Sequence, residues 1–184
     1  TPEQQKLSAR RMEVYAAMRA NMDHHIGRLV DHLKQTGQYE NTVVVFLSDN
    51  GAEPVELGTL VESVFNAEAK KWYLDKFDTS IEQMGRKGSV TDYGAAWAQV
   101  GSTPFRLYKA WTTEGGIHAP LIIAGAGVKN AGSIKPAVMH ATDLVPTFLE
   151  LAGAKHPSES DKKLAPLRGK SLTPLLSGKT ESVR

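Results

Sequence analysis

The stretch Thr42-Val43-Val44-Val45-Phe46-Leu47-Ser48-Asp49-Asn50-Gly51 decides the predicted fold. Residues 42–47 are β-branched or apolar without polar alternation, which is typical of a strand buried on both faces. Before this strand, apolar residues recur at steps of three, four or seven from Leu7 to Leu33, which predicts one long amphipathic helix. A helix, a short turn and a two-sided apolar strand together indicate an α/β fold, with a mostly parallel sheet and flanking helices.

Three later segments complete the predicted organisation. Residues 120–124, Pro-Leu-Ile-Ile-Ala, predict a second buried strand. Residues 142–153 have a capping residue, a proline in the first turn and a terminal glycine, so we expect a short helix there. Between the strands, residues 52–99 predict a long excursion with some helix, and residues 156–184 predict a polar linker and tail.

The composition excludes several classes of protein. The chain has 184 residues, of which 41% are hydrophobic and 23% charged, with a formal net charge of +2. Collagen-like, coiled-coil and disordered chains have other compositions, and a nearly neutral chain without basic runs gives no support to nucleic-acid binding. No apolar run is long enough to span a membrane. The absence of cysteine excludes disulfides, thiolate metal sites and a cysteine nucleophile within this sequence.

The first candidate site follows the first strand, because ligands of open α/β sheets collect where strands end. Asp49 and Asn50 would point to opposite faces of a regular strand, so they serve one ligand only if the strand breaks, as Gly51 permits. A carboxylate and an amide oxygen suit a hard cation such as Ca²⁺ or Mg²⁺. An Asx turn that closes the strand explains the same residues without any ligand, and the residues alone favour that turn.

A second candidate is Lys109, which lies among aromatic and basic residues and could bind an anion as a point charge. Taken alone, a surface lysine explains it better. Gly115 and Gly116 could present backbone N–H groups to an anion, but two glycines indicate a backbone requirement more strongly than a ligand. The histidines lack the spacing of a zinc site.

The order of these pieces resembles the sulfatase family, and bacterial arylsulfatases in particular. The resemblance covers most of the chain and rests on five motifs in one order. They are residues 42–51, Lys109, Glu114-Gly115-Gly116-Ile117-His118-Ala119-Pro120, residues 143–153 and Gly169-Lys170-Ser171-Leu172.

The resemblance implies an alkaline-phosphatase-like fold that hydrolyses sulfate esters with a formylglycine nucleophile. Asp49 and Asn50 match two ligands of a divalent cation, with Ca²⁺ expected ahead of Mg²⁺. Lys109 matches the catalytic lysine that binds the substrate sulfate, which could belong to a small sulfate ester or a sulfated glycan. The nucleophile and the other metal ligands belong upstream in the family, so we expect this chain to be an incomplete segment that is inactive alone and needs the rest of the same enzyme.

The resemblance also sets the expected domains and leaves alternatives. Residues 1–155 correspond to the C-terminal part of the catalytic α/β domain, and residues 156–184 lead toward a C-terminal subdomain. A phosphodiesterase or phosphonate hydrolase of the same superfamily would share the fold and the Asp49 region, and a non-catalytic binding module would keep the fold alone. The resemblance suggests a periplasmic or secreted protein, as many bacterial members are, and other members are cytoplasmic.

Overall fold

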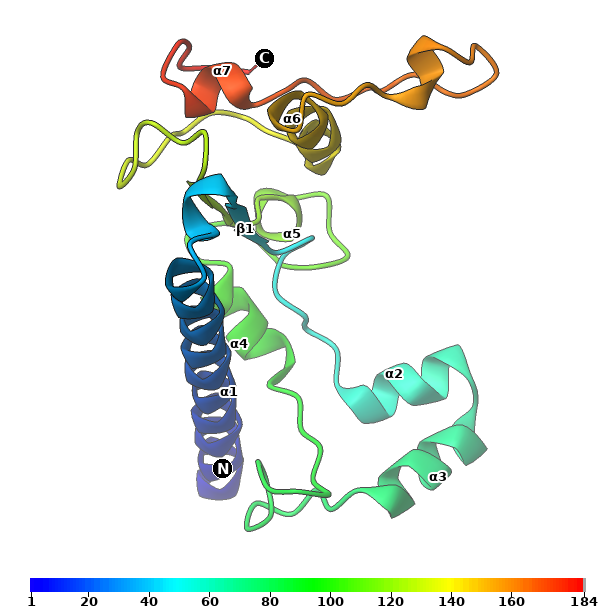
Figure 1. Ribbon diagram of the computed structural model, residues 1–184. Coiled ribbons are helices and arrows are strands. Elements are labelled where there is room, and N and C mark those ends of the chain that lie inside the picture. Colours follow the sequence, from blue (N-terminus) through cyan, green and yellow to red (C-terminus); the bar gives the residue numbers. More distant parts are fainter. Residues whose placement is uncertain (184) are drawn as a thin grey trace. The chain divides into compact units, whose positions relative to one another are not determined.

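The computed structural model describes residues 1–183, which form two compact units. The first unit holds residues 1–31 and 48–120, and the second holds residues 32–47 and the chain from Leu121 onward. Figure 1 follows the chain from the blue N-terminal helix to the red C-terminal helix. The division predicted at residue 155 concerns the domains of a whole enzyme and stays a prediction. No helix within residues 1–183 has the length and apolar character that a membrane crossing requires.

Five helices belong wholly or mainly to the first unit. They are α1 (Pro2–Gln35), α2 (Leu57–Val64), α3 (Ala67–Lys76), α4 (Gly94–Gly101) and α5 (Glu114–Ile117). The long helix predicted from the apolar periodicity is confirmed as α1, and the excursion between the strands contains helices as expected.

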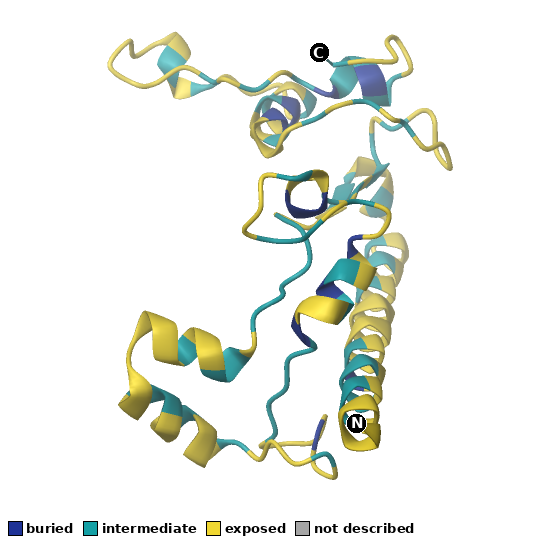
Figure 2. Cartoon of the chain, turned by 180° about the vertical axis from the view of Figure 1, so that it is seen from behind, coloured by how far each residue is buried: buried dark blue, intermediate teal, exposed yellow. Residues whose placement is uncertain are grey.

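The core of the first unit lies where α4 runs beside α1 (Figures 1 and 2). Val14 of α1 and Ala98 of α4 are buried there. Met84 is buried beside the N-terminal half of α1, where its carbonyl accepts a hydrogen bond from Arg10 at 2.8 Å. The indole N–H of Trp97 donates hydrogen bonds to the backbone oxygen and hydroxyl of Ser8, at 3.0 and 2.8 Å. Apolar packing and these hydrogen bonds therefore hold α4 against the N-terminal half of α1.

The second unit contains the sheet, which has two strands, β1 (Val43–Leu47) and β2 (Leu121–Gly125). Both predicted strands are therefore confirmed in position. They pair antiparallel, with Val43 opposite Gly125 and Leu47 opposite Leu121, so the parallel arrangement expected from sequence is wrong for this pair. The chain leaves β1 at Ser48 and returns at Pro120, whose carbonyl accepts a hydrogen bond from the Ser48 N–H at 3.2 Å. Because the excursion leaves and re-enters at the same end of the sheet, β2 must run opposite to β1.

The expected burial of the first strand on both faces is also wrong. Phe46 and Leu47 are about two-fifths exposed, at 38% and 40%, and Ile122 of β2 is 59% exposed. Within residues 1–183 the sheet packs mainly against η1 (Tyr39–Asn41), a single 3-10 turn. One turn is too small to cover either face of a sheet, which needs a full layer of helix or strand.

The remaining elements of the second unit are short. They are η2 (Ala141–Asp143), α6 (Leu144–Leu151), η3 (Pro157–Glu159) and α7 (Thr173–Leu176). The short helix predicted within residues 142–153 is confirmed as η2 followed by α6.

Asp143 joins two segments of the second unit and is fully buried. Its carboxylate accepts hydrogen bonds from the backbone N–H groups of His140 at 2.8 Å and Lys170 at 2.9 Å. One turn further along α6, the Thr147 hydroxyl accepts a hydrogen bond from the Leu172 N–H at 2.8 Å. The start of α6 is therefore bonded to the segment that leads into α7.

Three glycines bring separate backbones of the first unit into direct contact. The Gly51 N–H donates a hydrogen bond to the Gly116 carbonyl at 2.9 Å, and a Cβ on Gly51 would lie 1.8 Å from the Gly115 carbonyl oxygen. A Cβ on Gly115 or Gly116 would lie equally close to the carbonyl oxygens of Leu107 and Trp111, at 1.8 and 2.0 Å. Both glycines of α5 are buried. Only glycine fits at these positions, because the obstructing atoms belong to backbone that has no alternative rotamer.

The Gly51 contact predicts a large effect of a single methyl group. Gly51→Ala should lower the free energy of unfolding by about 3 kcal/mol, the upper part of the range for overpacking. Denaturant unfolding of the full-length gene product measures this. Gly27→Ala is the control, because Gly27 lies within α1 with nothing within 4 Å of the added Cβ, and alanine is the better helix former. Equal stability of the two variants would contradict the close backbone contact.

The buried Asp143 carboxylate predicts a second loss of stability. Asp143→Ala should lower the free energy of unfolding by about 2–3 kcal/mol, because the backbone N–H groups of His140 and Lys170 lose a buried charged acceptor. Denaturant unfolding measures this too, with Asp161→Ala as the control at an exposed position. An Asp143→Ala protein as stable as the control would show that these two hydrogen bonds do not hold the second unit together.

Candidate functional site

Asp49 and Asn50 lie in a bend that directly follows β1. The Ser48 hydroxyl donates a hydrogen bond to the Asn50 carbonyl at 2.8 Å, which closes the bend. Asp49 is exposed and Asn50 half-buried, and within residues 1–183 neither side chain forms a hydrogen bond or an ion pair. The strand therefore breaks where the sequence predicted. The two side-chain oxygens that an Asx turn would engage remain available to a ligand.

Lys109 lies in a loop between α4 and α5 whose backbone is unusual. Leu107 and Ala110 on either side of it adopt left-handed conformations, with φ of 62° and 74°. Non-glycine residues rarely adopt this conformation, and it persists only where the surroundings impose it. Gln99 of α4 supplies part of that constraint, because its side chain accepts from the Leu107 N–H and donates to the Phe105 carbonyl, both at 2.9 Å.

The structure brings Lys109 to the segment that follows Asp49 and Asn50. The Lys109 N–H donates a hydrogen bond to the Ala52 carbonyl at 3.1 Å. The charge of Asp49 is among the causes that raise the pKa of Lys109, after the hydrogen bond and charge of Glu53. The three residues predicted from the sequence thus belong to one cluster of loops, which the Gly51 and Gly116 contact holds together.

Glu53 is a member of this cluster that the sequence analysis missed. Its carboxylate accepts a hydrogen bond from the Lys109 ammonium at 2.6 Å through one oxygen, and from the Val55 N–H at 3.1 Å through the other. The hydrogen bond from Lys109 is the largest cause that lowers the pKa of Glu53, and burial opposes it. No spacing rule connects residues that are 56 positions apart, so only the fold identifies the pair.

Two tyrosines lie close to the Glu53 segment. Tyr15 of α1 and Tyr93, which precedes α4, have ring centroids 4.8 Å apart. Burial is the largest cause that raises the pKa of Tyr93, and the charges of Tyr15 and Glu53 act in the same direction. The aromatic pair therefore gives the segment a partly buried support from α1 and from the residue that precedes α4.

Gly115 and Gly116 serve the backbone, as their residue types suggested. The Gly115 N–H donates to the Arg106 carbonyl at 3.1 Å, and the Gly116 N–H donates to the Thr113 carbonyl at 2.8 Å. Because both donors are engaged within the protein, they cannot also bind an anion. Their function is close packing beside the Lys109 loop.

The donor set of Asp49 and Asn50 fits a hard cation, which prefers carboxylate and amide oxygens. It is a partial set, because no group of three or more acidic or histidine side chains within residues 1–183 is arranged to hold a metal ion. A complete coordination sphere for Ca²⁺ has six to eight oxygens. The described residues therefore supply at most part of such a sphere.

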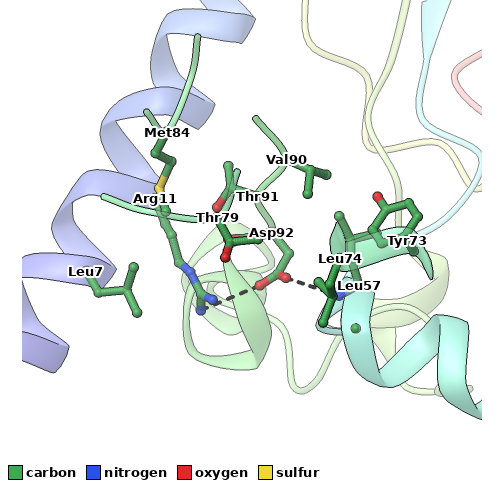
Figure 3. A pocket seen from close by; sticks show the side chains of 11 residues that line it. Leu7, Arg11, Leu57, Tyr73, Leu74, Thr79, Met84, Val90, Thr91 and Asp92 are labelled. Carbon is green, nitrogen blue, oxygen red and sulfur yellow. Dashed lines mark hydrogen bonds and ion pairs between the residues drawn. The ribbon is translucent and has the colours of Figure 1, made fainter. Parts of the chain in front are cut away.

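A separate cavity of about 260 Å³ lies between α1 and the helices of the excursion (Figure 3). An ion pair between Arg11 and Asp92 crosses it, with a nitrogen to oxygen distance of 3.5 Å. Asp92 also accepts a hydrogen bond from the Leu57 N–H at 3.0 Å, at the start of α2. None of Asp49, Asn50 and Lys109 lines this cavity, so it is distinct from the predicted site.

The sequence of this chain is similar to those of known sulfatases. A family model described as Sulfatase matches residues 1–154. The arylsulfatase of Klebsiella aerogenes is 41% identical over the whole of this chain, which covers 39% of that protein. The N-acetylglucosamine-6-O-sulfatase of Bacteroides thetaiotaomicron is 28% identical over 92% of the chain, which covers 21% of that protein. The chain thus spans well under half the length of these relatives.

Solved structures are similar as well. The structure of Ps i-CgsB in complex with k-i-k-neocarrahexaose has a TM-score of 0.54 and 27% identity, over 87% of this chain and 25% of that one. The structure of BT4656 in complex with its substrate, D-glucosamine-2-N,6-O-disulfate, has a TM-score of 0.51 and 23% identity, over 88% of this chain and 22% of that one. Most of this chain thus corresponds to part of a larger fold. From the family model and the whole-chain similarity, this chain belongs to the sulfatase family.

Proposed function

We propose that this chain supplies one side of the active site of a sulfuric ester hydrolase of the arylsulfatase type. The observation that carries the proposal is the loop cluster in which Asp49, Asn50 and Lys109 converge. A free carboxylate and a free amide oxygen lie on one segment. Lys109 is bonded to the next residues of that segment, to Ala52 through its backbone N–H and to Glu53 through its ammonium. A structural turn alone gives no reason to hold Leu107 and Ala110, on either side of Lys109, in left-handed backbone conformations.

In this proposal Asp49 and Asn50 are ligands of a divalent cation, Ca²⁺ ahead of Mg²⁺. Bound there, the cation would polarise the sulfate ester and stabilise negative charge that develops on it. Asp49 contributes a full negative charge to the coordination sphere and Asn50 a neutral dipole. The carboxylate should therefore matter more than the amide for holding the ion.

Lys109 would bind a sulfate oxygen. An ammonium has three N–H donors, and the hydrogen bond to Glu53 uses one of them. The remaining donors can contact an anion without displacing Glu53. Fixed N–H donors beside the ester oxygens stabilise charge that increases in the transition state, and they need no reorganisation at that moment. Lys109 is then a catalytic residue, since it touches the substrate.

The nucleophile of this reaction would come from outside these 184 residues. The sequence has no cysteine, one of the two residues from which a formylglycine can be made, and the resemblance to sulfatases places the nucleophile motif upstream of this segment. The isolated chain should therefore be inactive. The substrate class is an aryl sulfate or a sulfated glycan, and the glycan alternative has support from the relative named as an N-acetylglucosamine-6-O-sulfatase.

The proposal predicts graded losses in the full-length gene product. Asp49→Ala and Lys109→Ala should each lower kcat/KM for 4-nitrophenyl sulfate about 100- to 1,000-fold, the usual cost of removing one charge-stabilising group. Asn50→Ala should cause a smaller loss, and added Ca²⁺ should restore part of it because the site keeps its carboxylate. Steady-state kinetics at several Ca²⁺ concentrations measure all three.

Asp31→Ala and Lys6→Ala are the matched controls, because they remove the same charges from exposed positions on α1. Parental kcat/KM in Asp49→Ala or Lys109→Ala would remove that residue from the site. If the parent hydrolysed a phosphodiester or a phosphonate ester faster than every sulfate ester, the related hydrolase would replace the arylsulfatase. A folded parent inactive on all three substrate classes would support a binding module instead.

A further inference from the structure

We infer that Glu53 is a positioning residue for Lys109 that also limits the positive charge presented to the substrate, so that the site favours singly charged sulfate esters over doubly charged phosphate monoesters. The inference rests on the proposed function and extends it to a specificity determinant. The observation behind it is the 2.6 Å hydrogen bond between the Glu53 carboxylate and the Lys109 ammonium.

The geometry fixes Lys109 at two points. Its backbone N–H is bonded to the Ala52 carbonyl, and its ammonium is bonded to the side chain of the next residue, Glu53. The Glu53 carboxylate is itself oriented, because its second oxygen accepts from the Val55 N–H at 3.1 Å. A lysine side chain has much rotational freedom, and fixing both ends of it removes that freedom before a substrate binds.

Stability is a poor explanation for this pair. Both side chains are 44% exposed, and exposed ion pairs contribute little to the free energy of folding. An ion pair of the same 2.6 Å length joins Lys70 of α3 to Glu62 of α2, so the chain forms such contacts elsewhere without a site beside them. What distinguishes the Glu53 pair is its place next to the free Asp49 and Asn50 side chains.

The charges of the cluster explain the proposed preference for sulfate esters over phosphate monoesters. Glu53 neutralises the unit charge of Lys109, so the pair presents directed N–H donors with little net charge. A sulfate ester carries one negative charge, whereas a phosphate monoester carries close to two above pH 7, since its second pKa is about 6. An added positive charge would attract the doubly charged phosphate monoester more strongly than the singly charged sulfate ester. Removing the Glu53 charge should therefore favour phosphate monoesters.

Two variants of the full-length gene product separate the positioning effect of Glu53 from the effect of its charge. Glu53→Gln keeps the size of the side chain and removes its charge. It should raise the ratio of kcat/KM for 4-nitrophenyl phosphate to that for 4-nitrophenyl sulfate about tenfold, the order expected for one unit charge near an anion at a protein surface. Glu53→Asp keeps the charge and shortens the reach. It should lower kcat/KM for both substrates about equally and leave the ratio at the parental value.

Glu62→Gln is the matched control and should leave kcat/KM and the ratio unchanged. Thermal unfolding of each variant should give the parental Tm, because an exposed pair contributes little to stability. Should Glu53→Gln fail to fold, Glu53→Ala makes the same change of charge and carries the same expected ratio.

The outcomes separate this inference from the proposed function. A parent that hydrolyses 4-nitrophenyl sulfate while Glu53→Gln keeps the parental ratio would overturn the role of Glu53 and leave the sulfatase proposal standing. An equal shift of the ratio in Glu62→Gln would also overturn it, because the effect would then come from net charge alone. A parent inactive on every sulfate ester would overturn the proposed function, and the role of Glu53 would fall with it.

Discussion

The candidate site depends on the close contact between Gly51 and the two glycines of α5. A side chain at any of these positions would lie within about 2 Å of a backbone oxygen, so the contact exists only because Cβ is absent from all three. The contact fixes the bend that carries Asp49 and Asn50 relative to the segments that flank the Lys109 loop. The side-chain oxygens of Asp49 and Asn50 and the Lys109 ammonium, which are far apart in the sequence, thereby belong to one cluster of loops. Without this junction the chain would hold the right residue types in unrelated places.

Charge, rather than burial, distinguishes the loop cluster from the rest of the surface. Asp49 and Asn50 keep their oxygens free, and Lys109 is engaged by Glu53 with donors to spare. Each side chain contributes little to folding at this level of exposure. Their arrangement is costly in another way, since Leu107 and Ala110 beside Lys109 are held in left-handed conformations that residues other than glycine rarely adopt. Such a combination is expected where geometry serves binding or catalysis rather than stability.

The sequence predicted the local elements well, because local elements follow from local patterns. The apolar periodicity of α1, the β-branched run of β1 and the capping signals near Asp143 act over a few residues, and the structure confirms all three positions. The direction of β2 depends on where a long excursion returns, which no pattern encodes. The burial of β1 depends on which elements pack against it, and an apolar run shows only that the strand can be buried. Glu53 could not be found either, because its partner lies far along the chain and an isolated glutamate after a turn is unremarkable.

The most direct test of the account is a crystal structure of the full-length gene product grown with calcium and inorganic sulfate, with the metal located by its anomalous signal. The account predicts one calcium ion at about 2.3–2.6 Å from oxygens of Asp49 and Asn50. It also predicts a sulfate oxygen at about 2.7–2.9 Å from the Lys109 ammonium, with Glu53 still bound to that ammonium. Calcium bound by other residues, or a sulfate site from which Lys109 is absent, would contradict it.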